Sequence, residues 1–405
     1  MKYIALIECT DAGGVGIGMA VTQMGYRPLF LLDPQLYRAD TGLALQHFEC
    51  RTVNTHSIDA IINELNPIRD QIAAIATLVD GRISIAAEVA NKMGIPGPDS
   101  ACIVLKDKAE VAKWCAVCSA PSLVLSADKK IAKTSLIEKF NGKKIIAKQR
   151  QGFGAIGIKI LFSEDEKQNF IDETNCLDEW LIQEYFPGKL YSLEGWLDSS
   201  GVHILGWSSR KKINNTESEF KFEGFNTIDT ELTDSARVTI EYLFKKAGLR
   251  RGWFHIEFLI DIENKNMILI DANIGRIGGA MLPHVLAMSL NIQVTDLYQH
   301  ALEIQIFGKS HIEILPPKKL KKFYKCICFG SPHETVIQNV LLPKYPLEIG
   351  NLKVIRILGA GDHVAAMGKD DMSWIGFVAG EESVVDAYAK QIYIKTINQI
   401  YQATY

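Results

Sequence analysis

The first hundred residues alternate between short apolar runs and segments with helical spacing. Strands separated by helices are typical of a parallel sheet that helices cover. We therefore expect residues 1–105 to form a Rossmann-like α/β domain. The expected strands are 3–8, 28–32 and 73–78, and the expected helices are one that ends at Met24 and one at 83–93.

The alternation is lost after residue 105. Residues 106–188 predict a small α+β lobe, residues 189–315 a larger antiparallel region, and residues 316–405 an α+β subdomain. We expect a helix at 107–119 in the small lobe and a long terminal helix at 383–401. The predicted fold class is thus α/β and α+β, with an N-terminal parallel-sheet domain.

A glycine-rich hairpin lies between two predicted strands of the small lobe. Strand 144–148 ends at Lys148, and strand 158–162 follows the loop. Glycines let backbone N–H groups approach a polyphosphate closely, and the lysine supplies a fixed cation. The hairpin therefore predicts a phosphate-binding loop. Its residues include Gly152, Phe153, Gly154, Ala155 and Gly157.

Two successive strands of the larger region carry acidic side chains. Glu257 lies in an apolar strand, and Asp271 and Asn273 lie on the returning strand, about 5 Å away in an antiparallel pair. Two neighbouring carboxylates raise each other's pKa unless a cation lies between them. A few oxygen ligands suit Mg²⁺ (or Mn²⁺) that is shared with phosphate. The alternative is a pair of solvated strand ends.

Arg276 lies in the next glycine-rich turn, before Gly278 and Gly279. An arginine there presents a fork of donors to a carboxylate or a transferring phosphoryl group. The alternative is an arginine that caps the turn.

Upstream, an apolar strand ends in a Pro-Gly turn and offers backbone donors and acceptors to an adenine edge. Its residues are Gln183, Glu184, Tyr185 and Phe186.

Further candidates for substrate binding are less certain. Glu223 lies among phenylalanines and is a candidate partner for a substrate ammonium, and Glu194 is a candidate substrate contact. The run Arg210–Lys212 is either part of a substrate pocket or a solvated group of charges. His284 fits a packed helix position better than a place in the substrate site.

Composition limits the possible partners. A net charge of −3 gives no reason to expect a nucleic-acid partner, and no apolar run approaches the length of a membrane span. Eight scattered cysteines fit a reducing cytoplasm. Cys115 and Cys118 have redox-motif spacing, but inside a predicted helix a packing role is favoured. The Gly13–Gly18 turn, followed by Asp33, suggests a dinucleotide site only weakly, because Met19 replaces the third glycine.

Taken together, these motifs resemble the ATP-grasp superfamily, most closely the branch with bacterial L-amino acid ligases and biotin carboxylase-like proteins. The resemblance implies that ATP converts a small-molecule carboxylate, expected to be an amino acid, into an acyl phosphate, which an amine attacks to form an amide with release of ADP and phosphate. It implies that Lys108 and Lys148 bind ATP phosphates, that Arg276 stabilises the acyl phosphate, and that the adjoining glycines contact substrate. The implied metal ligands are Glu257, Asp271 and Asn273. Homodimers are common among such proteins.

The chain departs from the family pattern at three points. Asp271 replaces the usual glutamate, Arg276 lies three residues after the asparagine instead of two, and Lys189 or Leu190 replaces a ribose-binding acid. Three alternatives therefore stay open. They are a ligase or carboxylase that uses bicarbonate, an ATP-binding regulatory protein without turnover, and a dinucleotide-dependent oxidoreductase.

Overall fold

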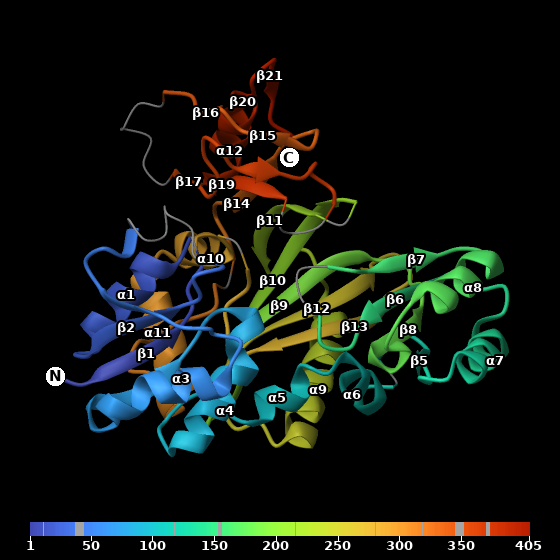
Figure 1. The fold of residues 1–405 in the computed structure, drawn as a ribbon, viewed down its shortest axis with the longest axis horizontal. Coiled ribbons are helices and arrows are strands. Elements are labelled where there is room, and N and C mark those ends of the chain that lie inside the picture. The colour runs from blue at the N-terminus through green and yellow to red at the C-terminus, as the bar shows by residue number, and fades with distance from the viewer. Residues whose placement is uncertain are drawn as a thin grey trace.

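The computed structural model describes the chain except residues 11, 37–43, 117, 153–155, 215, 280, 318, 345–351 and 370–372. Figure 1 shows the N-terminal part in blue, beside the central sheet in green and yellow. A small lobe projects on the right, and the C-terminal part lies above the sheet in red. None of the described helices is long and apolar enough to cross a membrane.

The N-terminal part contains the predicted parallel sheet. Its strand order is β3-β2-β1-β4, and each pair is parallel. The apolar faces of the helices pack on this sheet, so the predicted fold class is confirmed. The strands are β1 (Tyr3–Ile7), β2 (Arg27–Leu32), β3 (Glu49–Thr52) and β4 (Ile72–Ala76), and the helices are α1 (Gly14–Gln23), α3 (Ile58–Leu65) and α4 (Ile83–Met93).

The glycines of the first turn serve helix packing. Helix α1 begins within the glycine run and packs against α11 (Val294–Phe307). A Cβ on Gly16 would lie 2.9 Å from the Tyr298 ring, and a Cβ on Gly18 would lie 2.7 Å from the Phe48 ring. The close approach of side chains accounts for Gly16 and Gly18.

The small lobe has its own apolar core and a four-stranded sheet with the order β5-β8-β6-β7. The expected helix at 107–119 is shorter than predicted: α6 (Lys108–Trp114) ends before Cys115, and α5 (Ala101–Leu105) precedes it. Cys115 is buried, and this burial raises the pKa of its thiol to about 11, which favours packing over redox chemistry. The lobe comprises β5 (Ser122–Val124), α7 (Lys129–Phe140), β6 (Ile145–Gln149), β7 (Lys159–Leu161), α8 (Glu164–Glu173) and β8 (Trp180–Glu184).

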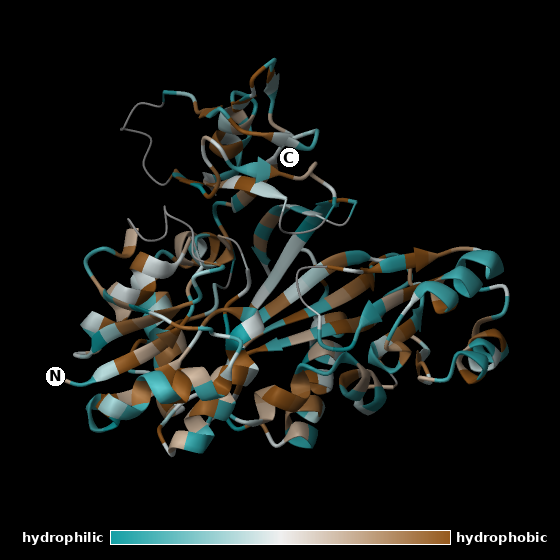
Figure 2. Cartoon of the chain, in the orientation of Figure 1, coloured by the Kyte–Doolittle hydropathy of each residue, from teal (hydrophilic) through white to brown (hydrophobic). Residues whose placement is uncertain are grey.

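The central sheet has eight strands in the order β13-β12-β9-β10-β11-β14-β19-β17. Helix α9 (Thr230–Ala247) packs on one face, while α10 (Leu282–Leu290) and α11 pack on the other. Figure 2 shows apolar residues along these strands and the helices beside them. The strands are β9 (Lys189–Asp198), β10 (Gly201–Ile213), β11 (Thr216–Gly224), β12 (Gly252–Asp261), β13 (Asn266–Ile274), β14 (Tyr324–Gly330), β17 (Lys353–Arg356) and β19 (Trp374–Glu381).

The expected terminal helix at 383–401 is wrong. Helix α12 (Glu382–Ala389) has only eight residues, and two strands follow it. Alternation of apolar and polar residues from Tyr393 to Lys395 buries Ile394 and exposes its neighbours, a strand pattern that overrides helical spacing. The remaining short strands are β15 (Thr335–Val336), β16 (Asn339–Leu341), β18 (His363–Val364), β20 (Tyr393–Lys395) and β21 (Ile400–Gln402).

Candidate active site

A cavity of about 370 Å³ lies where the parts of the chain meet. The small lobe contributes Lys148 and Gly152, and the central sheet contributes Glu257 and Asp271. Further lining residues come from the N-terminal part and from β19. Side chains of the predicted phosphate loop and the predicted metal site thus face one space. Phe153, Gly154 and Ala155 lie outside the described residues.

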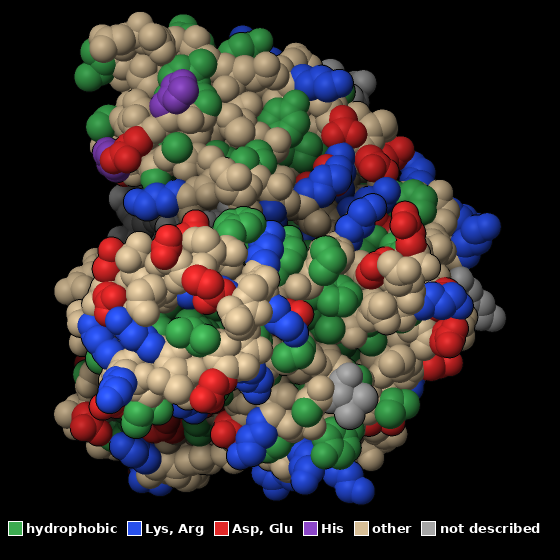
Figure 3. Space-filling model, turned by 90° about the vertical axis from the view of Figure 1, so that its right-hand side faces the viewer, with side chains coloured by type: hydrophobic (Ala, Val, Ile, Leu, Met, Phe, Trp, Pro, Cys, Tyr) green, Lys and Arg blue, Asp and Glu red, His purple; other side chains and the backbone are tan. Residues whose placement is uncertain are grey.

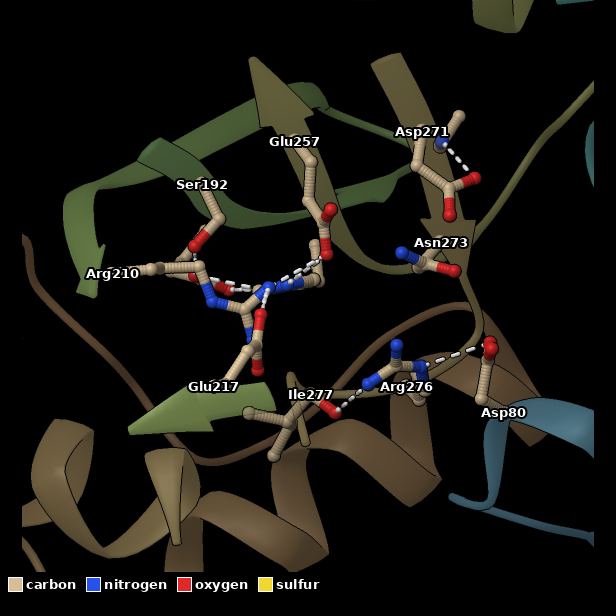
Figure 4. Close-up of polar contacts among 12 residues, drawn as sticks. Asp80, Ser192, Arg210, Glu217, Glu257, Asp271, Asn273, Arg276 and Ile277 are labelled. Atoms are coloured by element: carbon tan, nitrogen blue, oxygen red, sulfur yellow. Dashed lines mark hydrogen bonds and ion pairs between the residues drawn. The ribbon is translucent and has the colours of Figure 1, made fainter. Parts of the chain in front are cut away.

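The acidic side chains lie on neighbouring strands of the central sheet. The register of β12 and β13 places Glu257 opposite Asp271, and His255 opposite Asn273. Figure 4 shows Glu257, Asp271 and Asn273 along these two strands, with Arg210 and Arg276 nearby. The adjacency follows from antiparallel pairing, as the sequence pattern predicts.

Glu257 is bound by Arg210 and lies close to a second basic side chain, His255, whose Nε2 makes no hydrogen bond among the described residues. Its Oε1 accepts a hydrogen bond from Arg210 Nη1 at 2.7 Å and lies 3.4 Å from His255 Nε2. Burial alone would raise the pKa of Glu257, but the charge of Arg210, followed by the contact with His255, holds it well below its usual value. Glu257 is therefore ionised at neutral pH.

Arg210 is buried, so the interpretation of Arg210–Lys212 as a solvated run is wrong for its first member. Its side chain is 4% exposed and forms ion pairs with Glu257 and with Glu217 of β11. Lys211 and Lys212 are exposed, although Lys212 also lines the cavity. Glu217 was not foreseen from the sequence. The alternation along β10, which turns Arg210 to the same side as buried Ser208, is the signal that could have indicated burial.

Glu194 is fully buried and does not contact the cavity, in contrast to the expected substrate contact. Both of its oxygens lie 2.9 Å from His255 Nδ1, and one accepts a hydrogen bond from Ser192 Oγ. Burial opposes the charge on His255, but the Glu194 carboxylate raises the pKa of the imidazole above its usual value. Glu194 therefore supports His255 behind the site.

Two lysines that line the cavity contact β13. Lys148 Nζ donates to the carbonyl oxygen of Ile270 at 2.8 Å, and Lys108 Nζ lies 3.4 Å from Asp271 Oδ2. Lys108 also donates to the carbonyl oxygen of Gly152. Burial, together with the charge of Lys108, lowers the pKa of Lys148 to about 8.

Arg276 is bound by an acid from the N-terminal part that the sequence interpretation missed. Its Nε donates to Asp80 Oδ1 at 3.0 Å, and Lys106 contacts the same oxygen. Lys106 also donates to Asn273 Oδ1 at 3.1 Å. Although burial opposes ionisation, Arg276 and then Lys106 hold the pKa of Asp80 far below its usual value. Asp80 thus fixes the arginine in the wall of the cavity.

The glycines after Arg276 line the cavity, but Glu223 does not. A Cβ on Gly278 would lie 2.6 Å from His255 Nδ1, so this position requires glycine. The Glu223 carboxylate instead accepts hydrogen bonds from Ser209 and Thr227. The structure therefore gives Glu223 a local structural role, not the expected contact with a substrate ammonium.

The predicted adenine hinge lies outside the lining of this cavity. The backbone N–H groups of Glu184 and Tyr185 already donate to the carbonyl oxygens of Pro121 and Lys144. Gln183 is buried, and Lys144 lies over the Tyr185 ring. Any adenine contact must therefore use other groups of the hinge, such as the backbone of Phe186. Gly157, the last glycine of the phosphate loop, has a positive φ of 75° that favours glycine.

The donor set fits a hard cation that phosphate helps to bind. No group of three or more His, Cys, Asp or Glu able to hold a metal occurs among the described residues. Glu257, Asp271 and Asn273 offer only a few oxygens, which is typical of Mg²⁺ that also takes ligands from phosphate and water.

The surface of the small lobe carries charges of both signs. Figure 3, which looks onto this lobe, shows basic side chains interspersed with acidic ones, unlike a nucleic-acid interface.

Comparison with known proteins gives a family match for part of the chain and several structures of similar fold. Residues 106–279 match the family model described as an ATP-grasp domain. No curated protein matches the chain. The L-amino acid ligase from Bacillus licheniformis is similar in structure, with a TM-score of 0.77 and 12% identity over 98% of this chain and 99% of that one. The biotin carboxylase domain of Hydrogenobacter thermophilus 2-oxoglutarate carboxylase has a TM-score of 0.73 and 16% identity, over 97% and 90%.

A third similar structure is N5-carboxyaminoimidazole ribonucleotide synthetase from Thermus thermophilus. It has a TM-score of 0.69 and 12% identity, over 95% of each chain. At these identities the structures show a shared fold. The domain match and this fold confirm the resemblance predicted from the sequence: residues 106–279 match an ATP-grasp domain.

Proposed function

We propose that the protein is an ATP-dependent carboxylate–amine ligase. It activates an organic carboxylate, expected to be an amino acid, as an acyl phosphate and joins it to an amine, releasing ADP and phosphate. One observation carries the proposal. Lys108 and Lys148 line the same cavity as Glu257, Asp271 and Asn273, within the residues that match an ATP-grasp domain. This arrangement suits a triphosphate that contacts the lysines directly and the neighbouring oxygens through a metal ion.

The lysines and Arg276 have different roles in the proposed reaction. Lys148 and Lys108 bind the phosphates of ATP and keep them in line with the carboxylate. Arg276, fixed by Asp80, stabilises the charge of the acyl phosphate as it forms. Mg²⁺, when bound to Glu257, Asp271 and Asn273, supplies charge neutralisation at the phosphate oxygens. Closure of the phosphate loop excludes water from the acyl phosphate.

The alternative reaction with bicarbonate is supported by the fold of the carboxylase domain noted above. The cavity wall favours an organic substrate instead. Ile17, Leu78 and Pro283 line the cavity, and bicarbonate has no apolar group for them to contact.

All eight cysteines are free thiols, which supports the proposed cytoplasmic location.

The test is ADP release measured over a matrix of amino acids and amines with Mg²⁺, with a separate bicarbonate series and mass spectrometry of the products. We expect ADP release to require both an organic carboxylate and an amine, and the product to be an amide. Release with bicarbonate alone would instead establish a carboxylase. Tight ATP binding without release in any mixture would establish an ATP-binding protein without turnover.

A further inference from the structure

The two oxygens of Glu257 have different surroundings. Oε1 accepts a hydrogen bond from Arg210 and lies next to His255. Oε2 has no hydrogen-bond or ion-pair partner in the described part of the chain. The side chain is 16% exposed and lines the cavity. We propose that Glu257 binds metal through Oε2 alone, and that Arg210 and His255 fix its orientation through Oε1. This inference rests on the metal site of the proposed function and names the residues that position it.

Glu217 holds Arg210 from the opposite side. Arg210 Nη1 lies 2.7 Å from Glu217 Oε1, and Nη2 donates to Glu217 Oε2 at 2.8 Å, which makes a two-pronged pair. The Arg210 guanidinium also lies 4.7 Å from the centre of the Phe220 ring. Trp374 of β19 donates its indole N–H to the backbone oxygen of Glu217 at 2.7 Å. Arg210 is therefore fixed by contacts from β11, and β11 is in turn fixed by β19.

On the other side of Glu257, Glu194 fixes His255 through its Nδ1. The register of β9 and β12 places Glu194 opposite His255, and Ser192 opposite Glu257. His255, Glu194 and Ser192 are each 0% exposed. Figure 4 shows Arg210 between the carboxylates of Glu257 and Glu217. A buried chain of alternating acidic and basic groups thus runs from Glu194 to Glu217, with Glu257 at its centre.

This chain has a consequence for metal binding. Outer-shell partners that orient a metal ligand affect metal affinity by about 10- to 100-fold. Without the charge of Glu217, the nearest carboxylate to Arg210 is Glu257, and arginine favours a two-pronged pair with a carboxylate. Arg210 would then occupy Oε2 as well as Oε1. Glu217 and Glu194 are therefore positioning residues, although neither is a proposed ligand.

The experiment measures Mn²⁺ binding to the full chain with ADP by electron paramagnetic resonance, and ADP binding in EDTA by calorimetry. Glu217→Gln keeps the shape of the side chain and removes its charge. Glu219→Gln is the matched control, because Glu219 lies on the same strand and pairs with Lys211 and Lys325, away from the cavity. We expect Mn²⁺ affinity to fall about tenfold or more in Glu217→Gln and to stay unchanged in Glu219→Gln. ADP affinity without metal should be the same in all three proteins.

A second pair of variants distinguishes loss of metal affinity from loss of the fold. Arg210→Lys keeps the charge but cannot form the two-pronged pair with Glu217. Ser192→Ala removes only the hydroxyl that donates to Glu194. Both variants should weaken Mn²⁺ binding while thermal unfolding stays cooperative. Equal Mn²⁺ affinity in Glu217→Gln and Glu219→Gln would overturn the inference and leave the proposed function intact. Absence of Mn²⁺ binding in the wild-type protein with ADP would overturn both.

Discussion

Most carboxylates of the cavity wall already have a basic partner. Arg210 binds Glu257 and Glu217, Lys108 lies beside Asp271, and Arg276 binds Asp80. Lys148 differs, because no carboxylate lies within ion-pair distance of its ammonium among the described residues; a backbone carbonyl accepts from it instead. An anionic ligand is therefore the natural partner for Lys148.

The unpaired charge of Lys148 predicts a conflict between stability and binding. Because the folded-state pKa is lowered from 10.5 to about 8, the unfolded chain binds more protons between these values. The charge thus destabilises the fold below pH 8 by about 3 kcal/mol, and the penalty disappears as pH rises toward 10.5. Lys148→Met should raise the free energy of unfolding by about 1–3 kcal/mol at pH 7 and abolish stabilisation by ADP.

Thermal and urea unfolding at pH 7 and pH 9.5 measure this effect. The gain from Lys148→Met should be smaller at pH 9.5. Lys139→Met, at an exposed position of α7, is the control and should change neither stability nor ADP binding. A variant at 148 that is less stable than the wild-type protein at pH 7 would contradict the argument.

Glu257 gives a prediction about turnover. Glu257→Gln keeps the size of the side chain but removes the charge that Arg210 and a metal ion both require. ATP turnover with Mg²⁺ should fall about thirtyfold or more, equivalent to about 2 kcal/mol of transition-state stabilisation. Steady-state kinetics over a range of Mg²⁺ concentrations measure the loss. Glu263→Gln, in the exposed turn after β12, should leave turnover unchanged.

At the scale of elements, the sequence predicts those whose partners are close along the chain. The register of Glu257 and Asp271 could be foreseen because β12 and β13 are joined by a short turn. Strand β11 was missed because its first four residues, from Thr216 to Glu219, are all polar and show no alternation. Glu217 and Glu219 are acceptable in a sheet only because Arg210 and Lys325 neutralise them, and that pairing is decided by tertiary structure.

Helix α1 provides a prediction at this scale. An added methyl group on Gly16 would lie 2.9 Å from the Tyr298 ring of α11. Gly16→Ala should therefore force α1 and α11 apart and lower the free energy of unfolding by about 1–3 kcal/mol, despite the better helix propensity of alanine. Chemical denaturation measures the change, and Val15→Ala, at an exposed position of the same helix, is the control. A stabilised Gly16→Ala protein would show that α1 does not pack closely.

At the scale of the whole molecule, the cavity collects residues from distant parts of the chain. Asp80 comes from the N-terminal part, Lys148 from the small lobe, and Trp374 from β19. Local patterns predicted a phosphate loop and placed the acidic residues on neighbouring strands. They could not show that Asp80 binds Arg276 or that Trp374 reaches the cavity, because both contacts depend on how the parts pack together.

The continuity of the central sheet leads to a last prediction. Strands β14, β19 and β17 extend the sheet beyond β11, and their buried residues belong to the same apolar core as α10 and α11. A fragment of residues 1–315 would expose this core and leave β11 as an unpaired edge. We expect the fragment to aggregate and to lack a cooperative unfolding transition, as measured by size-exclusion chromatography and circular dichroism. Co-expression with residues 316–405 should restore a soluble complex. A fragment that is soluble and cooperatively folded alone would show that the sheet is divided into independent units at this point.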